Sequence, residues 1–80
     1  MKTVVVVSAS WCPQCGPYKK MLQSAGIAFQ EFDADSPLNQ EFLLSLGVRG
    51  LPTTFIYEGK EIVATVTGNN AKKVQELLGV

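Results

Sequence analysis

The sequence predicts an α/β protein whose elements follow in the order βαβαββα, with a mixed four-stranded sheet flanked by helices. Three observations predict this class. Two β-rich runs alternate with two helical patterns, a turn signal joins two further β-rich runs, and a helical pattern ends the chain. A β-α-β unit requires a parallel, right-handed crossover, whereas a hairpin adds antiparallel strands. The expected sheet is therefore mixed.

The first half of the chain predicts strand, helix and strand. Residues 3–7 form a β-branched run without alternation, as expected of a central strand buried on both faces. In the next pattern, apolar residues recur at helical spacing until Gly26, a position where helices commonly end in a left-handed residue. These apolar residues are Tyr18, Met21, Leu22 and Ala25. A short second strand then carries Ala28, Phe29 and Phe32 and ends at the acidic Asp33-Ala34-Asp35.

A second helix is expected after the acidic residues. Ser36 can cap it, Pro37 suits its first position, and its apolar stripe stops at Gly47. The stripe consists of Leu38, Phe42 and Leu46.

A hairpin and a last helix complete the prediction. The β-rich runs 53–57 and 62–67 are separated by Glu58-Gly59-Lys60-Glu61, which is a hairpin signal. Asn69 or Asn70 can start the last helix. Its inward residues are Val74, Leu77 and Leu78, with Gly79 near its end.

Length and composition indicate one globular domain over residues 1–80, because a chain this short has room for a single core. At 46% hydrophobic and 18% charged residues, the chain lies far from the disordered class. Seven basic residues balance seven acidic ones, so no general attraction for nucleic acid or an anionic membrane is expected. No apolar window approaches a membrane span, and no secretory signal is recognised at the start. We expect a cytoplasmic monomer.

The pair Cys12-Pro13-Gln14-Cys15 carries the chemistry that the sequence indicates. A bridge between these two cysteines closes too small a loop to staple a fold, so its value lies in being made and broken. The pair lies where the first strand gives way to the first helix, which predicts Cys12 at or near the N-cap and Pro13 at the first helical position. The positive helix end would then lower the pKa of Cys12 from about 8.5 toward 7.

Two roles follow for the two cysteines. We expect Cys12 to attack a partner disulfide, and Cys15, one helical turn inward and more buried, to resolve the mixed disulfide. This chemistry requires no metal or organic cofactor. Cys-x-x-Cys also begins many zinc sites, but zinc needs four ligands, and the chain has no further cysteine and no histidine. An intrachain zinc site is not expected.

A proline immediately before the third predicted strand is the second notable element. Pro52, in Gly50-Leu51-Pro52-Thr53, interrupts a sequence that otherwise predicts strand, which suggests an edge, a bulge or a cis peptide. A trans turn proline is the ordinary alternative, and the residues by themselves leave the choice open.

The two elements together resemble a known superfamily. Trp11-Cys12-Pro13-Gln14-Cys15 resembles the thioredoxin active-site stretch, and Val48-Arg49-Gly50-Leu51-Pro52-Thr53 resembles the segment that carries the cis-proline of thioredoxins and glutaredoxins. The short length, Gly26-Ile27, Asp33 and Leu46-Gly47-Val48-Arg49 look most like glutaredoxin-like redoxins that donate electrons to ribonucleotide reductase. The resemblance covers essentially the whole chain.

The resemblance implies a thioredoxin-like fold and a thiol-disulfide oxidoreductase that transports electrons through a redox-active disulfide. Pro52 would be cis beside the disulfide, the backbone of Leu51 would pair with an extended substrate segment, and Trp11 would join the docking surface. Gly68 stands where those redoxins carry a glycine before their last helix. The expected substrate-binding residues are Trp11, Pro13, Gln14, Leu51, Pro52 and Gly68.

Departures from the family patterns bear on partner and donor. Val6 replaces the buried acid of thioredoxins, and Gln14 replaces the tyrosine that glutaredoxins carry between their cysteines. The expected donor is therefore a flavin-dependent thioredoxin reductase that uses NADPH, and the expected partners are disulfide proteins such as ribonucleotide reductase. Pro17 is expected in the second helical turn, where it would bend the helix. Lys19 and Lys20 are expected on a solvated face.

Three alternatives stay open at this point. One is a glutathione-dependent glutaredoxin. Another is a module that uses this fold to bind a partner without redox turnover. The last is a metal or cluster scaffold built when two chains share their cysteine pairs.

Overall fold

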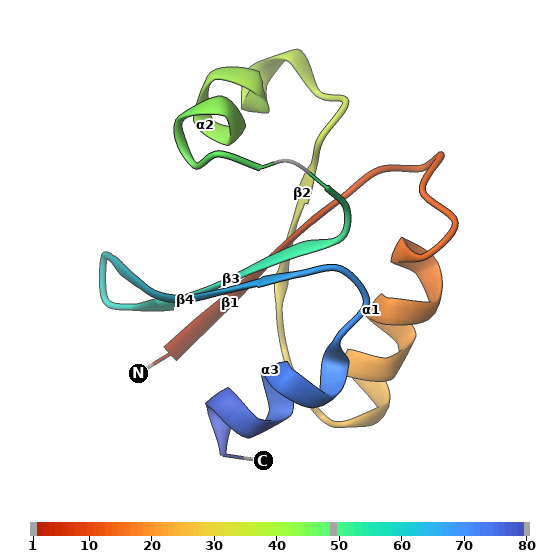
Figure 1. Ribbon diagram of the computed structural model, residues 1–80, viewed down its shortest axis with the longest axis vertical. Coiled ribbons are helices and arrows are strands. Elements are labelled where there is room, and N and C mark those ends of the chain that lie inside the picture. The colour runs from red at the N-terminus through yellow and green to blue at the C-terminus, as the bar shows by residue number, and fades with distance from the viewer. Residues whose placement is uncertain (1, 49, 80) are drawn as a thin grey trace.

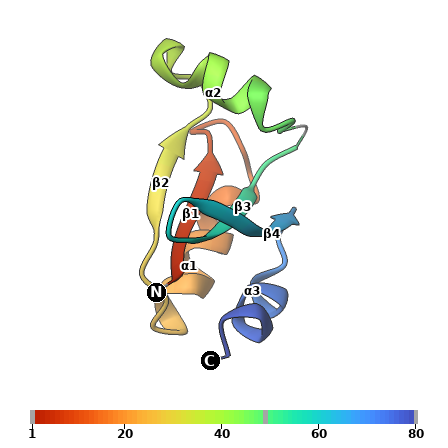
Figure 2. The same cartoon turned by 90° about the vertical axis from the view of Figure 1, so that its left-hand side faces the viewer.

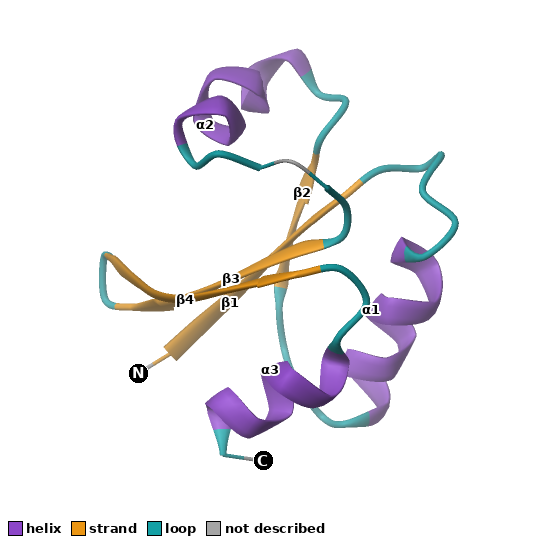
Figure 3. Cartoon of the chain, viewed as in Figure 1, coloured by secondary structure: helices purple, strands orange, loops and turns teal. Residues whose placement is uncertain are grey.

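A computed structural model describes residues 2–48 and 50–79 of the chain. Three residues lie outside this description: Met1, Val80 and Arg49, which belongs to the predicted segment before the third strand. The expected βαβαββα order is confirmed, with one short 3₁₀ helix added before the second helix (Figure 3). The elements are β1 (Lys2–Ser8), α1 (Cys15–Ser24), β2 (Gln30–Asp33), η1 (Pro37–Asn39), α2 (Gln40–Ser45), β3 (Thr53–Glu58), β4 (Glu61–Thr67) and α3 (Ala71–Leu78).

The four strands form one mixed sheet in the order β2-β1-β3-β4. β1 pairs with β2 in parallel and with β3 antiparallel, and β4 pairs with β3 antiparallel across the hairpin. β1 therefore has a neighbour on each side, and its residues from Val4 to Ser8 are all buried. The prediction of a central, doubly covered first strand is confirmed.

Helices cover both faces of the sheet. α1 and α3 lie on one side and α2 on the other, as Figures 1 and 2 show from two directions. Alternate valines of β1 divide between the two layers. Val4 and Val6 belong to the core under α1 and α3, whereas Val5 and Val7 belong to the core with Leu43 of α2.

One buried polar pair joins α1 to the sheet. Tyr18 and Thr54 are both fully buried, and the phenol oxygen of Tyr18 is hydrogen-bonded to the hydroxyl oxygen of Thr54. Burial raises the pKa of Tyr18, and the hydrogen bond to Thr54 opposes this shift in part. Both hydroxyl groups thus find a partner in the core, as buried polar groups require.

The predicted C-terminal end of α1 and the predicted start of α3 are confirmed. Gly26 follows α1 with φ 76°, and its N–H donates to the carbonyl of Gln23 at 3.0 Å. Glycine accepts this left-handed conformation without the steric cost that a Cβ adds. At the start of α3, the side chain of Asn70 accepts a hydrogen bond from the backbone N–H of Lys73 at 3.4 Å.

The predicted apolar stripe of the second helix is confirmed at Leu46, which packs against the core, and is wrong at Leu38. Leu38 is 93% exposed, and the buried residue is Leu43, with 7% of its surface exposed. Phe42 is partly exposed and packs its ring 5.4 Å from that of Phe32. The reason is that the segment begins as a 3₁₀ helix and becomes α-helical only at Gln40. Three residues per turn in the first part shift the phase of the later residues relative to a continuous α-helix.

No helix within the described ranges is long and apolar enough to cross a membrane.

Candidate functional site

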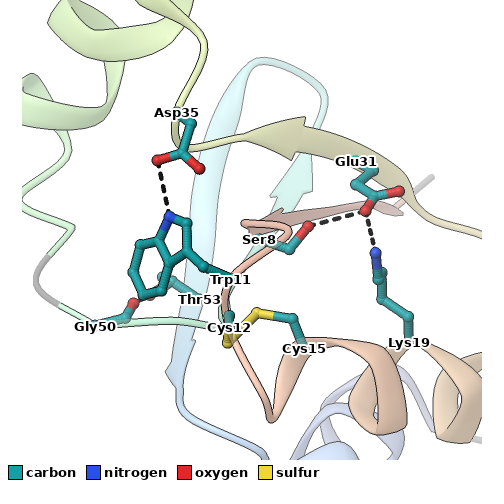
Figure 4. The surroundings of a disulfide bond; sticks show 9 residues. All are labelled: Ser8, Trp11, Cys12, Cys15, Lys19, Glu31, Asp35, Gly50 and Thr53. Carbon is teal, nitrogen blue, oxygen red and sulfur yellow. Dashed lines mark hydrogen bonds and ion pairs between the residues drawn. A yellow bond between two sulfur atoms is a disulfide. The ribbon is translucent and has the colours of Figure 1, made fainter.

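A disulfide joins Cys12, in the loop after β1, to Cys15, the first residue of α1 (Figure 4). Their Cα atoms lie 5.5 Å apart. The loop leaves β1 through a turn in which the N–H of Cys12 donates to the carbonyl of Ala9 at 3.1 Å. The disulfide packs with Ala9 against Ala34 and Leu51. Three segments of the chain thus meet at the sulfurs: the loop after β1, the loop after β2 and the segment before β3.

The predicted start of α1 is wrong. The helix begins at Cys15 with Gln14 as its N-cap, so Cys12 and Pro13 precede the helix. The cause is Pro17, which has no N–H to donate to the carbonyl of Pro13. The first uninterrupted i to i−4 hydrogen bond is therefore the one from the N–H of Tyr18 to the carbonyl of Gln14, at 3.1 Å.

The expected position of Pro17 is wrong for the same reason. Pro17 is the third helical residue and lies in the first turn. The first four N–H groups of a helix have no acceptor within it, so a proline there removes no helical hydrogen bond. No bend of α1 is required.

The two cysteine residues differ in accessibility. Cys12 retains 9% of its surface and Cys15 only 1%. Cys15 is also the first helical residue, one position after the N-cap, instead of lying a full turn inside the helix. Of the two, Cys12 is the cysteine that an incoming group can reach.

The Leu51-Pro52 peptide bond is cis. Pro52 is fully buried, and its carbonyl accepts a 2.7 Å hydrogen bond from the N–H of Gly68, which follows β4. The hydroxyl of Thr53 donates to the carbonyl of Gly50 in the same segment (Figure 4). A backbone hydrogen bond therefore links two of the predicted substrate-binding residues, Pro52 and Gly68.

Trp11, directly before the first cysteine, is 66% exposed and tied to a carboxylate. Its indole Nε1 donates a 2.9 Å hydrogen bond to Oδ1 of Asp35, whose own N–H donates to Oδ1 of Asp33 at 2.9 Å. Sequence reasoning noted the acidic residues without giving them a role. The available signal was the parallel pairing of β1 and β2, which places the residues after both strands at one edge of the sheet.

A second carboxylate, that of Glu31, lies on the strand beside Val6, the position that resembles the site of the buried acid in thioredoxins. Val6 is fully buried, and its partner on the neighbouring strand is Glu31. Oε1 of Glu31 accepts a 2.9 Å hydrogen bond from the hydroxyl of Ser8 and forms an ion pair with Nζ of Lys19. The hydrogen bond from Lys19, followed by that from Ser8, holds the pKa of Glu31 below its usual range.

The pairing of Lys19 corrects the expectation for the two lysines. Lys19 is half-buried and paired with Glu31, so it is not simply part of a solvated face. Lys20 is exposed, as expected.

A groove of about 540 Å³ opens beside the disulfide. Its lining comes from the loop before α1, the loop after β2, α2 and the segment before β3. The described lining residues are Trp11, Cys12, Pro13, Gln14, Ala34, Gln40, Leu43, Leu44, Val48, Gly50 and Leu51. Four predicted substrate-binding residues belong to this lining, whereas Pro52 and Gly68 are absent from its described part. The contribution of α2 was missed because its helical phase was predicted wrongly.

Within the described ranges, no three His, Cys, Asp or Glu residues come together in a group that could hold a metal ion.

Comparisons with known proteins place the chain among the redoxins. A family model described as Glutaredoxin matches residues 4–62. A glutaredoxin from Pseudomonas aeruginosa is 35% identical over 60 residues, which cover 72% of this chain and 71% of that protein. The solved thioredoxin of Trypanosoma brucei brucei matches with a TM-score of 0.87 and 25% identity, over 99% of this chain and 73% of that one.

A third match shows the fold alone. It is a chain in a crystal structure of a complex between ferredoxin:thioredoxin reductase and thioredoxin f2, with a TM-score of 0.77 and 22% identity. The match covers 98% of this chain and 74% of that one.

Proposed function

This chain belongs to the glutaredoxin family and has the thioredoxin-like fold, and we propose that it reduces protein disulfides by dithiol exchange through Cys12 and Cys15. One observation carries the proposal. Cys12 of the disulfide lines an open groove, whereas Cys15 is buried and is not among the described lining residues. This asymmetry suits a cysteine that attacks and a cysteine that resolves.

The exchange begins from the reduced form of the chain. The thiolate of Cys12 attacks one sulfur of the partner disulfide, so that a bond from Cys12 to that sulfur forms while the partner's bond breaks. The released partner sulfur leaves as a thiolate and takes up a proton. Cys15 then loses its proton and attacks the Cys12 sulfur, which releases the second partner thiolate. Two electrons pass to the partner, and the chain is left with the Cys12–Cys15 disulfide.

We place ribonucleotide reductase among the partners and a flavin-dependent thioredoxin reductase, fed by NADPH, upstream. The support is the resemblance of the cysteine and cis-proline segments to redoxins of that kind. The chemistry resides in the two sulfurs, so the proposal includes no metal or organic cofactor bound to the chain. We further propose that residues 1–80 act as one domain and as a monomer in the cytoplasm.

A second candidate is a glutathione-dependent glutaredoxin. The family model and the Pseudomonas aeruginosa relative, both described as glutaredoxin, favour it. In that case glutathione, instead of a reductase protein, returns the disulfide to the dithiol.

Reduction of insulin disulfides separates the two candidates. The chain is assayed once with thioredoxin reductase and NADPH, and once with glutathione, glutathione reductase and NADPH. Turnover in the first system supports dithiol reduction of protein disulfides, and turnover confined to the second supports the glutaredoxin alternative. The double variant Cys12→Ser/Cys15→Ser is the control. Retention of biological function by this double variant would favour a binding module without redox turnover.

A further inference from the structure

The groove beside the disulfide offers apolar side chains to whatever approaches Cys12. Leu44 of α2 is 78% exposed although the neighbouring Leu43 is buried in the core. Burial of Leu43 fixes α2 against the sheet, so Leu44 is held in a defined place without contributing to the core. Trp11 adds a second large exposed side chain, which its hydrogen bond to Asp35 holds in position.

Cys12 lines this groove and is absent from the described lining of the charged hollow beside α1. That second hollow, of about 590 Å³, lies between α1 and the segment leading into β2, and its lining includes Lys19, Lys20 and Glu31. Cys12 belongs to the apolar groove and to no other described hollow of comparable volume. Among the described residues, a group bonded to Cys12 therefore has mainly apolar neighbours.

The exchange chemistry identifies the occupant. In the mixed disulfide, a partner sulfur is bonded to Cys12. The residues on either side of the partner's cysteine must then lie over the walls of the groove, because a covalent bond anchors them there. Apolar walls gain free energy when they cover an apolar side chain, whereas an uncompensated charge in the same place loses its hydration. The amide side chains of Gln14 and Gln40 remain available to the partner's backbone.

We propose that Leu44, together with Trp11, makes the chain selective for protein disulfides in which a large aliphatic or aromatic residue flanks the target cysteine. This inference rests on the proposed function and adds its substrate class. Full burial of a leucine side chain corresponds to roughly 10- to 100-fold in an equilibrium. Because the groove is open on one side, we expect a preference of about tenfold in kcat/KM.

The test compares two disulfide-bridged peptides that differ at one residue next to a cysteine, leucine in one and glutamate in the other. Hydroxyethyl disulfide, which has no flanking residue, reports the exchange chemistry alone. The full chain should reduce the leucine peptide about tenfold faster than the glutamate peptide. Leu44→Asn should lower that preference to about twofold, measured as the ratio of the two peptide rates within the variant and normalised to its own rate with hydroxyethyl disulfide.

Leu38→Asn is the matched control. Leu38 is a more exposed leucine, in η1 just before α2, and it is not among the described residues of the groove. This variant should keep the preference of the unmodified chain. Circular dichroism and thermal unfolding verify that both variants fold.

The outcomes are separable. Reduction of hydroxyethyl disulfide with no peptide preference, or with a preference that survives Leu44→Asn, overturns this inference and leaves the proposed function standing. Failure to reduce any disulfide overturns the proposed function itself. A higher kcat/KM for a glutathione mixed disulfide than for the leucine peptide also overturns the selectivity. So does a dimer in sedimentation velocity that Leu44→Asn dissociates, because a second copy would then cover the groove.

Discussion

The indole Nε1 of Trp11 donates a 2.9 Å hydrogen bond to Oδ1 of Asp35, so the residue before Cys12 is tied to the loop after β2. Replacement of Asp35 by alanine removes the acceptor and should free the indole. An exposed hydrogen bond of this kind contributes about 0.5 to 1.5 kcal/mol, so we expect a roughly two- to twelvefold lower kcat/KM for protein disulfides. Acrylamide quenching of the single tryptophan should rise in parallel.

Asp35→Asn is the control for charge, because its amide oxygen can still accept the bond from the indole. This variant should behave nearly like the unmodified chain. Equal losses in the alanine and asparagine variants would show that the negative charge, and not the hydrogen bond, is what matters.

The different accessibility of the two cysteine residues leads to a second prediction. Cys15→Ser leaves Cys12 able to attack but removes the group that resolves the adduct. Incubated with an oxidised protein substrate, this variant should accumulate a mixed disulfide that mass spectrometry detects, and its turnover with thioredoxin reductase should fall to background. Cys12→Ser should form no adduct. If the Cys12→Ser variant is the one that traps substrate, the two roles are reversed.

The Tyr18–Thr54 pair gives a prediction for stability. Tyr18→Phe leaves the hydroxyl of Thr54 fully buried without its partner, and a lost buried partner costs about 1 to 3 kcal/mol. Urea unfolding at neutral pH measures the loss. Tyr18→Phe combined with Thr54→Val removes both polar groups, so the double variant should be more stable than the sum of the two single changes implies. Simple additivity would show that the hydrogen bond does not couple the two residues.

The same tyrosine predicts a response to alkali. Burial raises the pKa of Tyr18 in the folded chain above the ordinary value of 10.0, so the unfolded chain releases this proton first. The stability linked to this group is fully present below pH 10 and is lost as the pH rises through the folded pKa. Tyr18→Phe should lose less stability than the unmodified chain between neutral pH and alkaline pH. Parallel losses would contradict the assignment.

The lowered pKa of Glu31 predicts the opposite pH dependence. Its contribution to stability is present above the ordinary value of 4.5 and is lost as the pH falls through the lower folded pKa. Because the carboxylate is nearly half exposed, we expect Glu31→Gln to cost only about 0.5 kcal/mol at neutral pH, and nothing once the carboxylate is protonated in acid. Thermal unfolding at both pH values measures this difference.

Lysine variants provide the control for the Glu31 prediction. Lys19→Met should reproduce most of the loss, whereas Lys20→Met, on the exposed face of the same helix, should not. An equal effect of the two lysine variants would indicate general electrostatics instead of the Lys19–Glu31 pair.

Local patterns predicted the order of the elements because each depends on neighbouring residues. The β-branched run of β1, the turn at Gly59 and the glycine after α1 each carry their signal within a few residues. The cis bond before Pro52 is different, because residue physics left it open and only the resemblance pointed to it.

The rest of the site depends on contacts between distant residues or on the exact phase of a helix. The contacts of Asp35 with Trp11 and of Glu31 with Lys19 can be predicted only once the parallel pairing of β1 and β2 is known. Leu44 could not be placed in the groove while a continuous α-helix was assumed from Leu38 onward. These misses share one cause: the position of a side chain around a helix, or at the edge of a sheet, is set by tertiary structure.

Pro17 lies two residues after Cys15, and its lack of an amide proton delays the helix until Cys15. Any other residue at position 17 could donate its backbone N–H to the carbonyl of Pro13, and the helix could then begin earlier, near Cys12. Pro17 thus keeps Cys12 in the loop and Cys15 in the helix. A residue two positions after the second cysteine therefore determines where the loop ends and the helix begins.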